Sequence, residues 1–417
     1  MLLTQALFAL SGVPICTGAA LSFFINGRVG PRWSFRIYAL IWIIGQLIAV
    51  GAQGNIVTMY AARIIVGFGI GPLTAIGPIA LVEIAPAEIR GLLTSWFSVA
   101  MLMSLFVAAF TVYGCFVHMA SSTLQWQIPF FTVALFMALA ILASFFIYES
   151  PRWLFLAGRD EEATETLVLL RGLPFGSPRV QSELEEIRAS IVKERAAFGS
   201  ASTYSLKGLR AVLKETFLVK ANLRRTQQAS ISYALAQLSG ANSITAYLVP
   251  VLGMVGIKGD TAYSLFVTGM YSMSKFFTLI ASFFFVEAIG RRNSLFLGIT
   301  VQMISDTYIA SLSRKAAIAA IFIHGFGYAM GLLILPYIFV SELWPKQIRS
   351  SGAALITDNW GAFHFFAGWC ALALVYVFYI VPETAGVPLE QLDELFKGPI
   401  VSILYLSNPT HQTQKND

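Results

Sequence analysis

Long apolar segments recur along most of this chain, and short stretches that carry most of the charge separate them. Mainly apolar runs of about 18 residues or more are long enough to cross a lipid bilayer as α-helices. The pattern therefore predicts an all-α integral membrane protein. Ten spans are expected, at 3–25, 35–53, 57–82, 92–117, 127–148, 229–254, 262–286, 293–312, 316–341 and 362–381.

The composition agrees with a membrane protein and excludes an ordinary soluble one. Hydrophobic residues make up 57% of the 417 residues, charged residues only 12%, and the mean hydropathy is +0.71, whereas soluble domains carry about 25% charged residues. The net charge of +6 is explained by basic residues retained in cytoplasmic loops, so no nucleic-acid partner is expected. The three cysteines have no metal-ligand spacing, and no metal or cofactor is expected.

The charge of the loops predicts their side of the membrane. The basic loops 26–34, 83–91, 287–292 and 342–351 are expected in the cytoplasm. The segment 152–225 carries 22 of the 50 charged residues in a pattern typical of amphipathic cytoplasmic helices. The expected domains are two transmembrane halves at 1–150 and 226–386, a helical linker at 151–225, and a tail at 387–417.

Three charged phrases occur twice, which indicates a parallel internal duplication. GRVGPR at 27–32 matches EAIGRR at 287–292, VEIAPAEIRG at 82–91 matches SELWPKQIRS at 341–350, and ESPRW at 149–153 matches PETAG at 382–386. The last interval is 66 residues in the first half but 41 in the second, a difference of 25. At ~1.5 Å per residue this is about one span. The first half is also short at its start, so a complete version is expected to have twelve spans.

These phrases, taken in order, resemble the sugar porter family of the major facilitator superfamily, and the resemblance covers nearly the whole chain. Its fold, two pseudo-symmetric helical halves, is the expected fold, here with family helices 1 and 11 absent. The resemblance rests on GRVGPR, Arg63 with Gly67, Gly69 and Gly71, the Glu83–Arg90 phrase, ESPRWLF at 149–155, AQLSGAN at 236–242, EAIGRR, the Glu342–Arg349 phrase and PETAG.

The resemblance assigns the repeated charges to a cytoplasmic latch between the two halves. In the family such charges join the halves when the transporter is open outward and separate when it opens inward. Exposed ion pairs are weak, ~0–1 kcal/mol each, so they can break in every cycle. Alternatively, the arginines only set the topology. The expected gating residues are Arg28, Arg32, Glu83, Arg90, Glu149, Arg152, Glu287, Arg291, Arg292, Glu342 and Arg349.

The resemblance also places a substrate site between the halves, near the middle of the bilayer. Gln237 and Asn242 match sugar-binding positions, and amides suit hydroxyl-rich ligands because they both donate and accept hydrogen bonds. The alternative is a polar contact between packed helices. Three further candidate substrate residues are Ser98, Tyr247 and Tyr337. In the resemblance, Ser98 replaces the family's usual glutamine, the tyrosine pair is Ala246 and Tyr247, and Tyr337 stands where a tryptophan is common, which puts a plain hexose site in doubt.

Lys275 is a departure of another kind, because the family usually has asparagine there. It lies 12 residues from Glu287, or ~18 Å along a helix, close to the middle of the bilayer. A lysine at that depth needs a partner. Two partners are considered: an internal carboxylate, Asp306 or Asp358, and the carboxylate of a substrate such as quinate or a sugar acid.

Two further intramembrane groups have open interpretations. In proton-coupled members the arginine that matches Arg63 works with an aspartate on the first helix, which is missing here, so Arg63 is either a coupling residue or a structural one. His324 is either a titrating group or, as we expect, a packed and hydrogen-bonded histidine.

The sequence thus predicts a multi-pass protein of the cell membrane that moves a sugar, polyol or cyclic polyhydroxy acid by alternating access, with protons as a possible second partner in intact relatives. It is not expected to be an enzyme. A truncated, non-transporting homologue or a nutrient sensor is the alternative.

Overall fold

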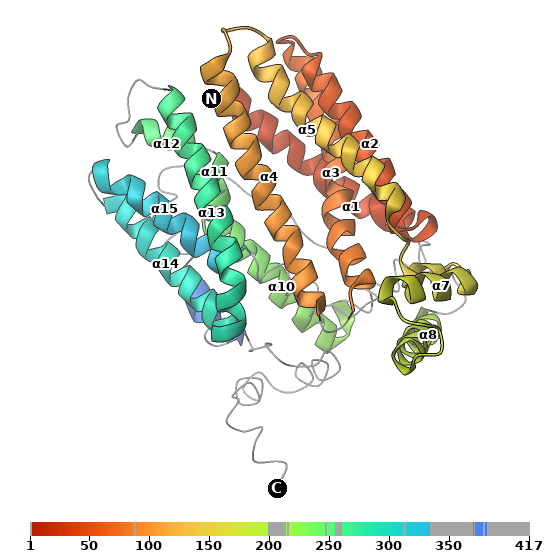
Figure 1. Ribbon diagram of the computed structural model, residues 1–417. Helices are drawn as coiled ribbons and strands as arrows, with labels where there is room; N and C mark the ends of the chain where they lie inside the picture. Colours follow the sequence, from red (N-terminus) through yellow and green to blue (C-terminus); the bar gives the residue numbers. More distant parts are fainter. Residues whose placement is uncertain are drawn as a thin grey trace. The chain divides into compact units, whose positions relative to one another are not determined.

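The computed structural model describes residues 2–86, 89–198, 214, 217–246, 248–254, 261–311, 314–333, 370, 372–377 and 380–381. These residues form helices, turns and short links, and no β-strand occurs among them. The predicted all-α class is confirmed. By their contacts, the described residues group into two compact units, which are treated in turn (Figure 1).

The first unit contains a bundle of four long helices: α1 (Leu2–Val29), α2 (Pro31–Val50), α3 (Ile56–Ile84) and α5 (Leu124–Ala143), the last followed by the short 3₁₀ helix η2 (Ser144–Phe146). Helices α1 and α2 both pack against α3, and α5 packs against α2 (Figure 1). Glycines allow this close approach. A Cβ atom added to Gly69 on α3 would lie 2.7 Å from the backbone nitrogen of Trp42 on α2.

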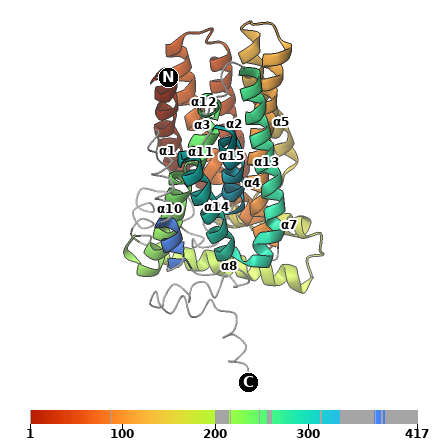
Figure 2. The same cartoon turned by 90° about the vertical axis from the view of Figure 1, so that its left-hand side faces the viewer.

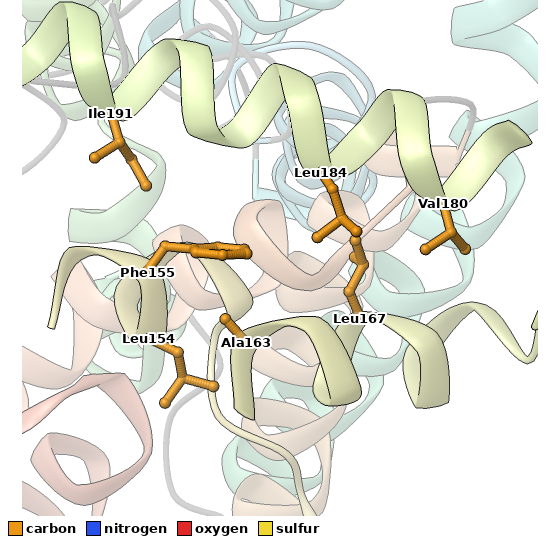
Figure 3. Packing of buried hydrophobic residues seen from close by; sticks show 7 residues of the cluster. All are labelled: Leu154, Phe155, Ala163, Leu167, Val180, Leu184 and Ile191. Atoms are coloured by element: carbon orange, nitrogen blue, oxygen red, sulfur yellow. The ribbon is translucent and has the colours of Figure 1, made fainter. Parts of the chain in front are cut away.

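The first unit also contains three amphipathic helices: α6 (Pro151–Leu156), α7 (Asp160–Arg171) and α8 (Pro178–Phe198). Helix α7 begins with three acidic residues, which favour a helix N-terminus, and its C-cap is the left-handed Gly172. The apolar faces of the three helices meet in one buried cluster (Figure 3). The amphipathic helices predicted in 152–225 are confirmed in this part. The cluster consists of Leu154, Phe155, Ala163, Leu167, Val180, Leu184 and Ile191.

The second unit contains most of α4 (Arg90–His118) together with the helices that follow the amphipathic segment. Helices α14 and α15 pack against each other, and α13 packs against α15 (Figure 2). Aromatic rings join α4 to α13, where Phe106 stacks on Phe276 at 6.1 Å between centroids. The helices after the amphipathic segment are α10 (Lys220–Leu238), α11 (Ala241–Ala246), α12 (Leu248–Met254), α13 (Thr261–Ile289), α14 (Arg291–Ser311) and α15 (Arg314–Met330).

Four helices of the described part are long and apolar enough to cross a membrane: Pro31–Val50, Ile56–Ile84, Trp96–His118 and Leu124–Phe146. They coincide with four of the predicted spans. The predicted span at 229–254 is not one continuous helix, because helix α10 ends at Leu238 and Gly240 has a positive φ of 79°. The total of ten spans, like the boundaries of the predicted domains, stays a prediction.

Two turns of the structure support the predicted duplication. Gly30 joins α1 to α2 with a φ of 89°, and Gly290 joins α13 to α14 with a φ of 90°. Each glycine carbonyl then accepts a hydrogen bond from the backbone N–H of a fully buried serine four residues on, Ser34 or Ser294. The predicted loops 26–34 and 287–292 are therefore too long, since a left-handed glycine can reverse the chain in one residue.

Candidate substrate site and charged networks

The candidate substrate residues Gln237 and Asn242 lie on either side of the break between α10 and α11. The Asn242 Nδ2 atom donates a 2.7 Å hydrogen bond to Gln237 Oε1. Gly240 makes this contact possible, because its positive φ ends α10 and turns the chain into α11 within two residues. The structure thus brings together the two amides that the sequence singled out. Asn242 is exposed and Gln237 is half-buried, so both amides keep groups for a ligand.

Lys275, on α13, is bound to the same broken helix. Its Nζ atom donates a 2.9 Å hydrogen bond to Thr245 Oγ1 on α11 and lies 5.2 Å and 5.1 Å from the ring centroids of Tyr271 and Tyr328. The side chain is only 2% exposed. Among the described residues, Lys275 has no direct ion pair with Asp306. The second suggested carboxylate, Asp358, lies outside the described residues.

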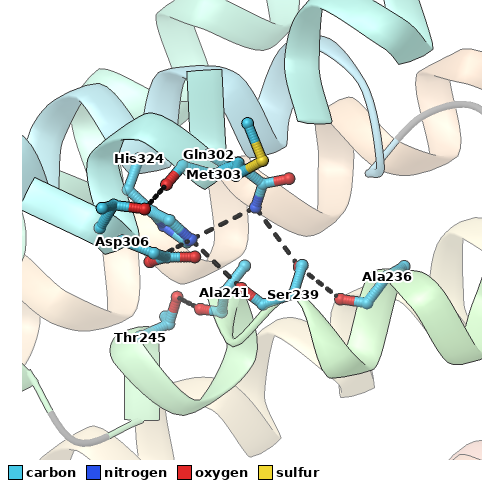
Figure 4. A network of polar contacts seen from close by, with 9 residues as sticks. Ala236, Ser239, Ala241, Thr245, Gln302, Met303, Asp306 and His324 are labelled. Carbon is cyan, nitrogen blue, oxygen red and sulfur yellow. Dashed lines mark hydrogen bonds and ion pairs between the residues drawn. The ribbon is translucent and has the colours of Figure 1, made fainter. Parts of the chain in front are cut away.

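A buried polar cluster connects α14 and α15 to the helix break (Figure 4). Gln302 Nε2 on α14 donates to Ser239 Oγ at 3.3 Å, and His324 Nε2 on α15 is 3.3 Å from the Ser239 carbonyl oxygen. The same imidazole nitrogen is 3.5 Å from Asp306 Oδ1. All four side chains are at most 1% exposed. His324 is thus packed and hydrogen-bonded, as expected, but its neighbours form a network that the sequence did not reveal.

The other predicted site residues are dispersed. Ser98, on α4, is fully buried, and its hydroxyl has no partner in the described part of the chain. The Arg63 guanidinium lies 5.7 Å from the ring centroid of Phe130 on α5, a cation–π contact that favours a structural role. Tyr247 and Tyr337 fall outside the described residues.

Several predicted gating residues of the first half form one network at the end of its bundle. Glu149 Oε1 accepts hydrogen bonds from the backbone N–H groups of Arg32 at 3.0 Å and Ser150 at 3.2 Å. The Ser150 hydroxyl donates to Glu83 Oε2 at 2.6 Å, and the Arg32 side chain donates to the Ile147 carbonyl oxygen at 3.0 Å. The network therefore joins the ends of α2, α3 and α5 mainly through backbone groups.

Burial raises the pKa of the Glu149 carboxyl above its ordinary value, and the two backbone N–H donors and the Arg32 charge oppose this effect without cancelling it. Part of the burial comes from Gly30, whose Cα faces the carboxylate so closely that an added Cβ would lie 3.0 Å from Glu149 Oε2. The absence of a side chain at Gly30 thus makes room for this carboxylate.

The remaining gating candidates do not join this network in the same way. The Arg152 side chain donates to Ser190 Oγ on α8 at 2.8 Å, within the amphipathic helices. Arg28 is exposed, whereas Arg291 and Arg292 are half-buried beside the second turn. Glu342 and Arg349 lie outside the described residues, as do the side chains of Arg90 and Glu287, so the latch between the halves stays a prediction.

Sequence reasoning missed two anchoring arginines. Arg36, on α2, donates to Ser144 Oγ at 2.8 Å and to the Ser144 carbonyl oxygen at 2.9 Å, and its guanidinium lies 3.8 Å from the Phe145 ring centroid. Arg171, on α7, donates to the carboxylate of Glu183 and to the Ile84 carbonyl oxygen at the end of α3. Arg36 lies one helical turn after Arg32, and this spacing was the available signal.

A family profile described as "Sugar (and other) transporter" matches residues 2–358. The chain belongs to this transporter family. Its members are transporters and not enzymes, so this is a multi-pass membrane protein of a transporter family. Among the described residues, no group of three or more His, Cys, Asp or Glu side chains is placed to hold a metal ion.

Curated relatives of this family member include two fungal permeases and a yeast transporter. It is 29% identical to a "Probable quinate permease" of Aspergillus niger, over 91% of this chain and 76% of the relative. It is also 29% identical to the "Quinate permease" of Emericella nidulans, over 92% and 78%. Identity to the "Low-affinity glucose transporter HXT1" of Saccharomyces cerevisiae is 28%, over 91% and 71%.

Solved structures confirm the fold. The family member superposes on a structure of the proton:xylose symporter XylE with a TM-score of 0.75 at 19% identity, covering 94% of this chain and 89% of that one. A partially occluded, inward-open form of XylE from E. coli gives a TM-score of 0.71 at 18% identity, with 93% and 89% covered. The major facilitator fold predicted from the motifs is therefore confirmed.

Proposed function

We propose that this transporter moves a polyhydroxylated solute (a sugar, a polyol or a cyclic polyhydroxy acid such as quinate) across the membrane by alternating access. The observation that carries the proposal is the contact between Gln237 and Asn242 at the helix break. The contact uses one donor of Asn242 and one acceptor lone pair of Gln237. It leaves the Gln237 amide nitrogen and the Asn242 carbonyl oxygen to bind a hydroxyl group that both donates and accepts.

Within this class, the surroundings of Lys275 favour a solute that carries a carboxylate. Thr245, which binds Lys275, lies one helical turn after Asn242, so the ammonium group is joined to the element that carries the candidate sugar-binding amide. Lys275 contacts no carboxylate among the described residues, and a buried lysine in this state can bind the carboxylate of a ligand. The names of two relatives also favour a solute with a carboxylate, since one is described as a probable quinate permease and the other as a quinate permease.

The Glu149 network is the proposed cytoplasmic gate on the first half. The carboxylates of this network are bound by backbone N–H groups and a hydroxyl, and each such bond is worth about 1.5–3 kcal/mol net, so single bonds can be exchanged during a transport cycle. Movement of α3 against α5 would change the distance between Glu83 and Ser150 first, because Ser150 joins the two carboxylates of the network, donating its hydroxyl to Glu83 and its backbone N–H to Glu149.

Uptake of labelled quinate, glucose and a polyol into transporter-null yeast cells tests the function. We expect saturable uptake of at least one solute, and a loss of about tenfold in kcat/KM in Asn242→Ala, which corresponds to about 1.4 kcal/mol. Gln227→Ala is the matched control, since Gln227 is an exposed polar residue on the same helix α10. Binding by purified protein without uptake would instead support the sensor alternative.

Substitution of Lys275 tests the substrate class. Lys275→Gln removes the charge and keeps a donor for Thr245 Oγ1, so uptake of the carboxylate solute should fall while uptake of a neutral sugar changes little. A parallel loss for both solutes, with normal expression, would show that Lys275 acts on the fold and not on a substrate carboxylate.

A further inference from the structure

Asp306, on α14, carries a fully buried carboxyl group. It is 0% exposed, and neither of its side-chain oxygens has a hydrogen-bond partner among the described residues. The His324 Nε2 atom lies 3.5 Å from Oδ1 but makes no hydrogen bond with it. An ionised carboxylate that is buried without hydrogen bonds is costly inside a membrane helix. A proton on one of the oxygens removes that cost.

His324 offers a second position for a proton. Its Nε2 atom is 3.5 Å from Asp306 Oδ1, 3.3 Å from the Ser239 carbonyl oxygen and 3.3 Å from the amide nitrogen of Gln302. The tautomer with the hydrogen on Nε2 donates to the Ser239 oxygen, whereas the other tautomer accepts from Gln302. In the first tautomer the Nδ1 atom has a free lone pair, and it is buried without a partner in the described part of the chain. A proton can therefore occupy either a carboxylate oxygen of Asp306 or His324 Nδ1.

Other titratable groups among the described residues lie near this pair. Lys275 and Tyr271 belong to α13, and Cys370 belongs to the last described helical segment. Lys275 is the cation among these three groups, and it is held by Thr245 on α11. Deprotonation of Asp306 would therefore attract two groups, His324 and Lys275, that now hold the broken helix.

We propose that Asp306 and His324 form a proton-binding site whose occupancy sets the position of the α10–α11 break. The proton enters from water onto a carboxylate oxygen of Asp306 or onto His324 Nδ1, and it returns to water when it leaves. When the proton leaves, the carboxylate draws the His324 N–H from the Ser239 carbonyl oxygen and the Lys275 ammonium from Thr245. Both contacts lie within three residues of Gln237 or Asn242, so the candidate binding amides shift with the proton.

The proton itself can be observed without any transport. In infrared spectra of the purified protein, a protonated carboxyl group has a C=O stretching band that a carboxylate lacks. We expect such a band at neutral pH in the wild type, its loss in Asp306→Asn, and its displacement in His324→Gln. A wild-type spectrum without the band at neutral pH would overturn the proposal, and this result does not depend on whether the protein transports anything or whether the variants fold.

The effect of the proton on the amides of Gln237 and Asn242 rests on the proposed function, and the pH profile of uptake tests it. Between about pH 5 and 8, KM of the wild type should change at least about fivefold, and that change should disappear in Asp306→Asn and His324→Gln. Ser305→Ala is the control, since Ser305 is equally buried on α14 and its hydroxyl contacts none of these groups. A pH-dependent KM that persists in Asp306→Asn would refute the link, whereas absence of all uptake, with the infrared band present, would refute only the proposed function.

Discussion

At the scale of single residues, the Glu149 carboxyl lies outside the membrane-spanning helices and its ionisation depends on its neighbours. It accepts two backbone hydrogen bonds through one oxygen, while the other oxygen faces Gly30. Burial makes ionisation of this carboxyl unfavourable, and the hydrogen bonds compensate only in part. Glu149 therefore stabilises the bundle by accepting hydrogen bonds, but its negative charge destabilises the bundle because the carboxylate is buried.

The pH dependence of stability should reveal this double role. Because the pKa of Glu149 is raised by folding, the folded state holds more protons than the unfolded state above the ordinary carboxyl pKa. The free energy of unfolding should then fall as pH rises through that window. Glu149→Gln keeps an acceptor oxygen and cannot ionise, so it should lose less stability over the same window.

Thermal unfolding in detergent between about pH 4 and 8 measures the difference between wild type and variant at each pH. Glu161→Gln, at an exposed position of α7, is the control and should follow the wild type. If Glu149→Gln also follows the wild type, burial does not raise the pKa of the Glu149 carboxyl.

At the scale of helices, contact between α2 and α3 depends on the small size of Gly69. An added methyl group would lie 2.7 Å from the Trp42 backbone nitrogen and 2.7 Å from its Cβ, and neither atom can move without moving α2. Gly69→Ala should therefore destabilise the protein by about 1–3 kcal/mol through overpacking.

Gly114→Ala on α4 is the matched control for this prediction. Nothing lies within 4 Å of a Cβ added there, so the same substitution should be neutral or slightly stabilising. The comparison of unfolding midpoints in detergent isolates packing from helix propensity, and equal midpoints for the two variants would contradict the prediction.

The attachment of the amphipathic helices to the bundle depends on another local feature, the side chain of Arg171. Arg171 donates to both oxygens of Glu183, at 2.5 and 2.8 Å, and to the Ile84 carbonyl oxygen at 3.0 Å. Lysine cannot reproduce this fork, so Arg171→Lys should weaken the attachment by about 1–3 kcal/mol. Faster cleavage of the α6–α8 segment by chymotrypsin is the expected result.

Arg159, the N-cap residue of α7, provides the control for Arg171. The Arg159–Glu162 pair is exposed, with side chains 51% and 53% accessible, against 6% for Arg171 in its pair with Glu183. Arg159→Lys should therefore change the cleavage rate little, because exposed pairs are worth ~0–1 kcal/mol. Equal rates for both variants would assign the attachment to the apolar cluster alone.

At the scale of the whole molecule, chain order and packing do not coincide. Helix α4 precedes the amphipathic segment but packs within the second unit, where Phe106 meets Phe276 and Phe110 meets Phe266 at 6.4 Å between centroids. A chain divided into residues 1–205 and 206–417 should therefore reassemble when the fragments are co-expressed, because α4 of the first fragment completes the second unit.

Copurification of the second fragment with a tagged first fragment measures this reassembly. Replacing Phe106 and Phe110 by alanine should reduce the copurified amount, since each aromatic pair contributes about 0.5–1.5 kcal/mol beyond its buried area. Phe136→Ala is the control, because Phe136 is 59% exposed on α5. Recovery of the first fragment alone would contradict the prediction.

Much of the fold could be predicted because apolar length and repeated motifs act over short stretches of chain. The matched phrases around Gly30 and Gly290 correctly indicated two equivalent turns, since a one-residue reversal requires a glycine. The break at Gly240 was missed because apolar content alone does not distinguish a continuous helix from one that bends at a left-handed residue.

The candidate site could be predicted only where a motif names residues that are close in sequence. Gln237 and Asn242 are five residues apart and meet across one turn. Ser239, Gln302 and His324 come from three helices, and their contacts depend on the rotation of each helix about its axis, which spacing does not determine at this accuracy. The Lys275 bond to Thr245 was missed for the same reason. Helix spacing indicates the depth of Lys275 in the bilayer but not the direction in which its side chain points.

The Arg171 contact has a practical consequence for arresting the protein. Arg171 of α7 binds the Ile84 carbonyl oxygen at the end of α3, and α7 shares an apolar core with α6 and α8. A rigid antibody fragment raised against these three water-exposed helices would therefore fix the orientation of the membrane helices from outside the lipid. Such a fragment would add mass and a recognisable outline for particle alignment in cryo-electron microscopy.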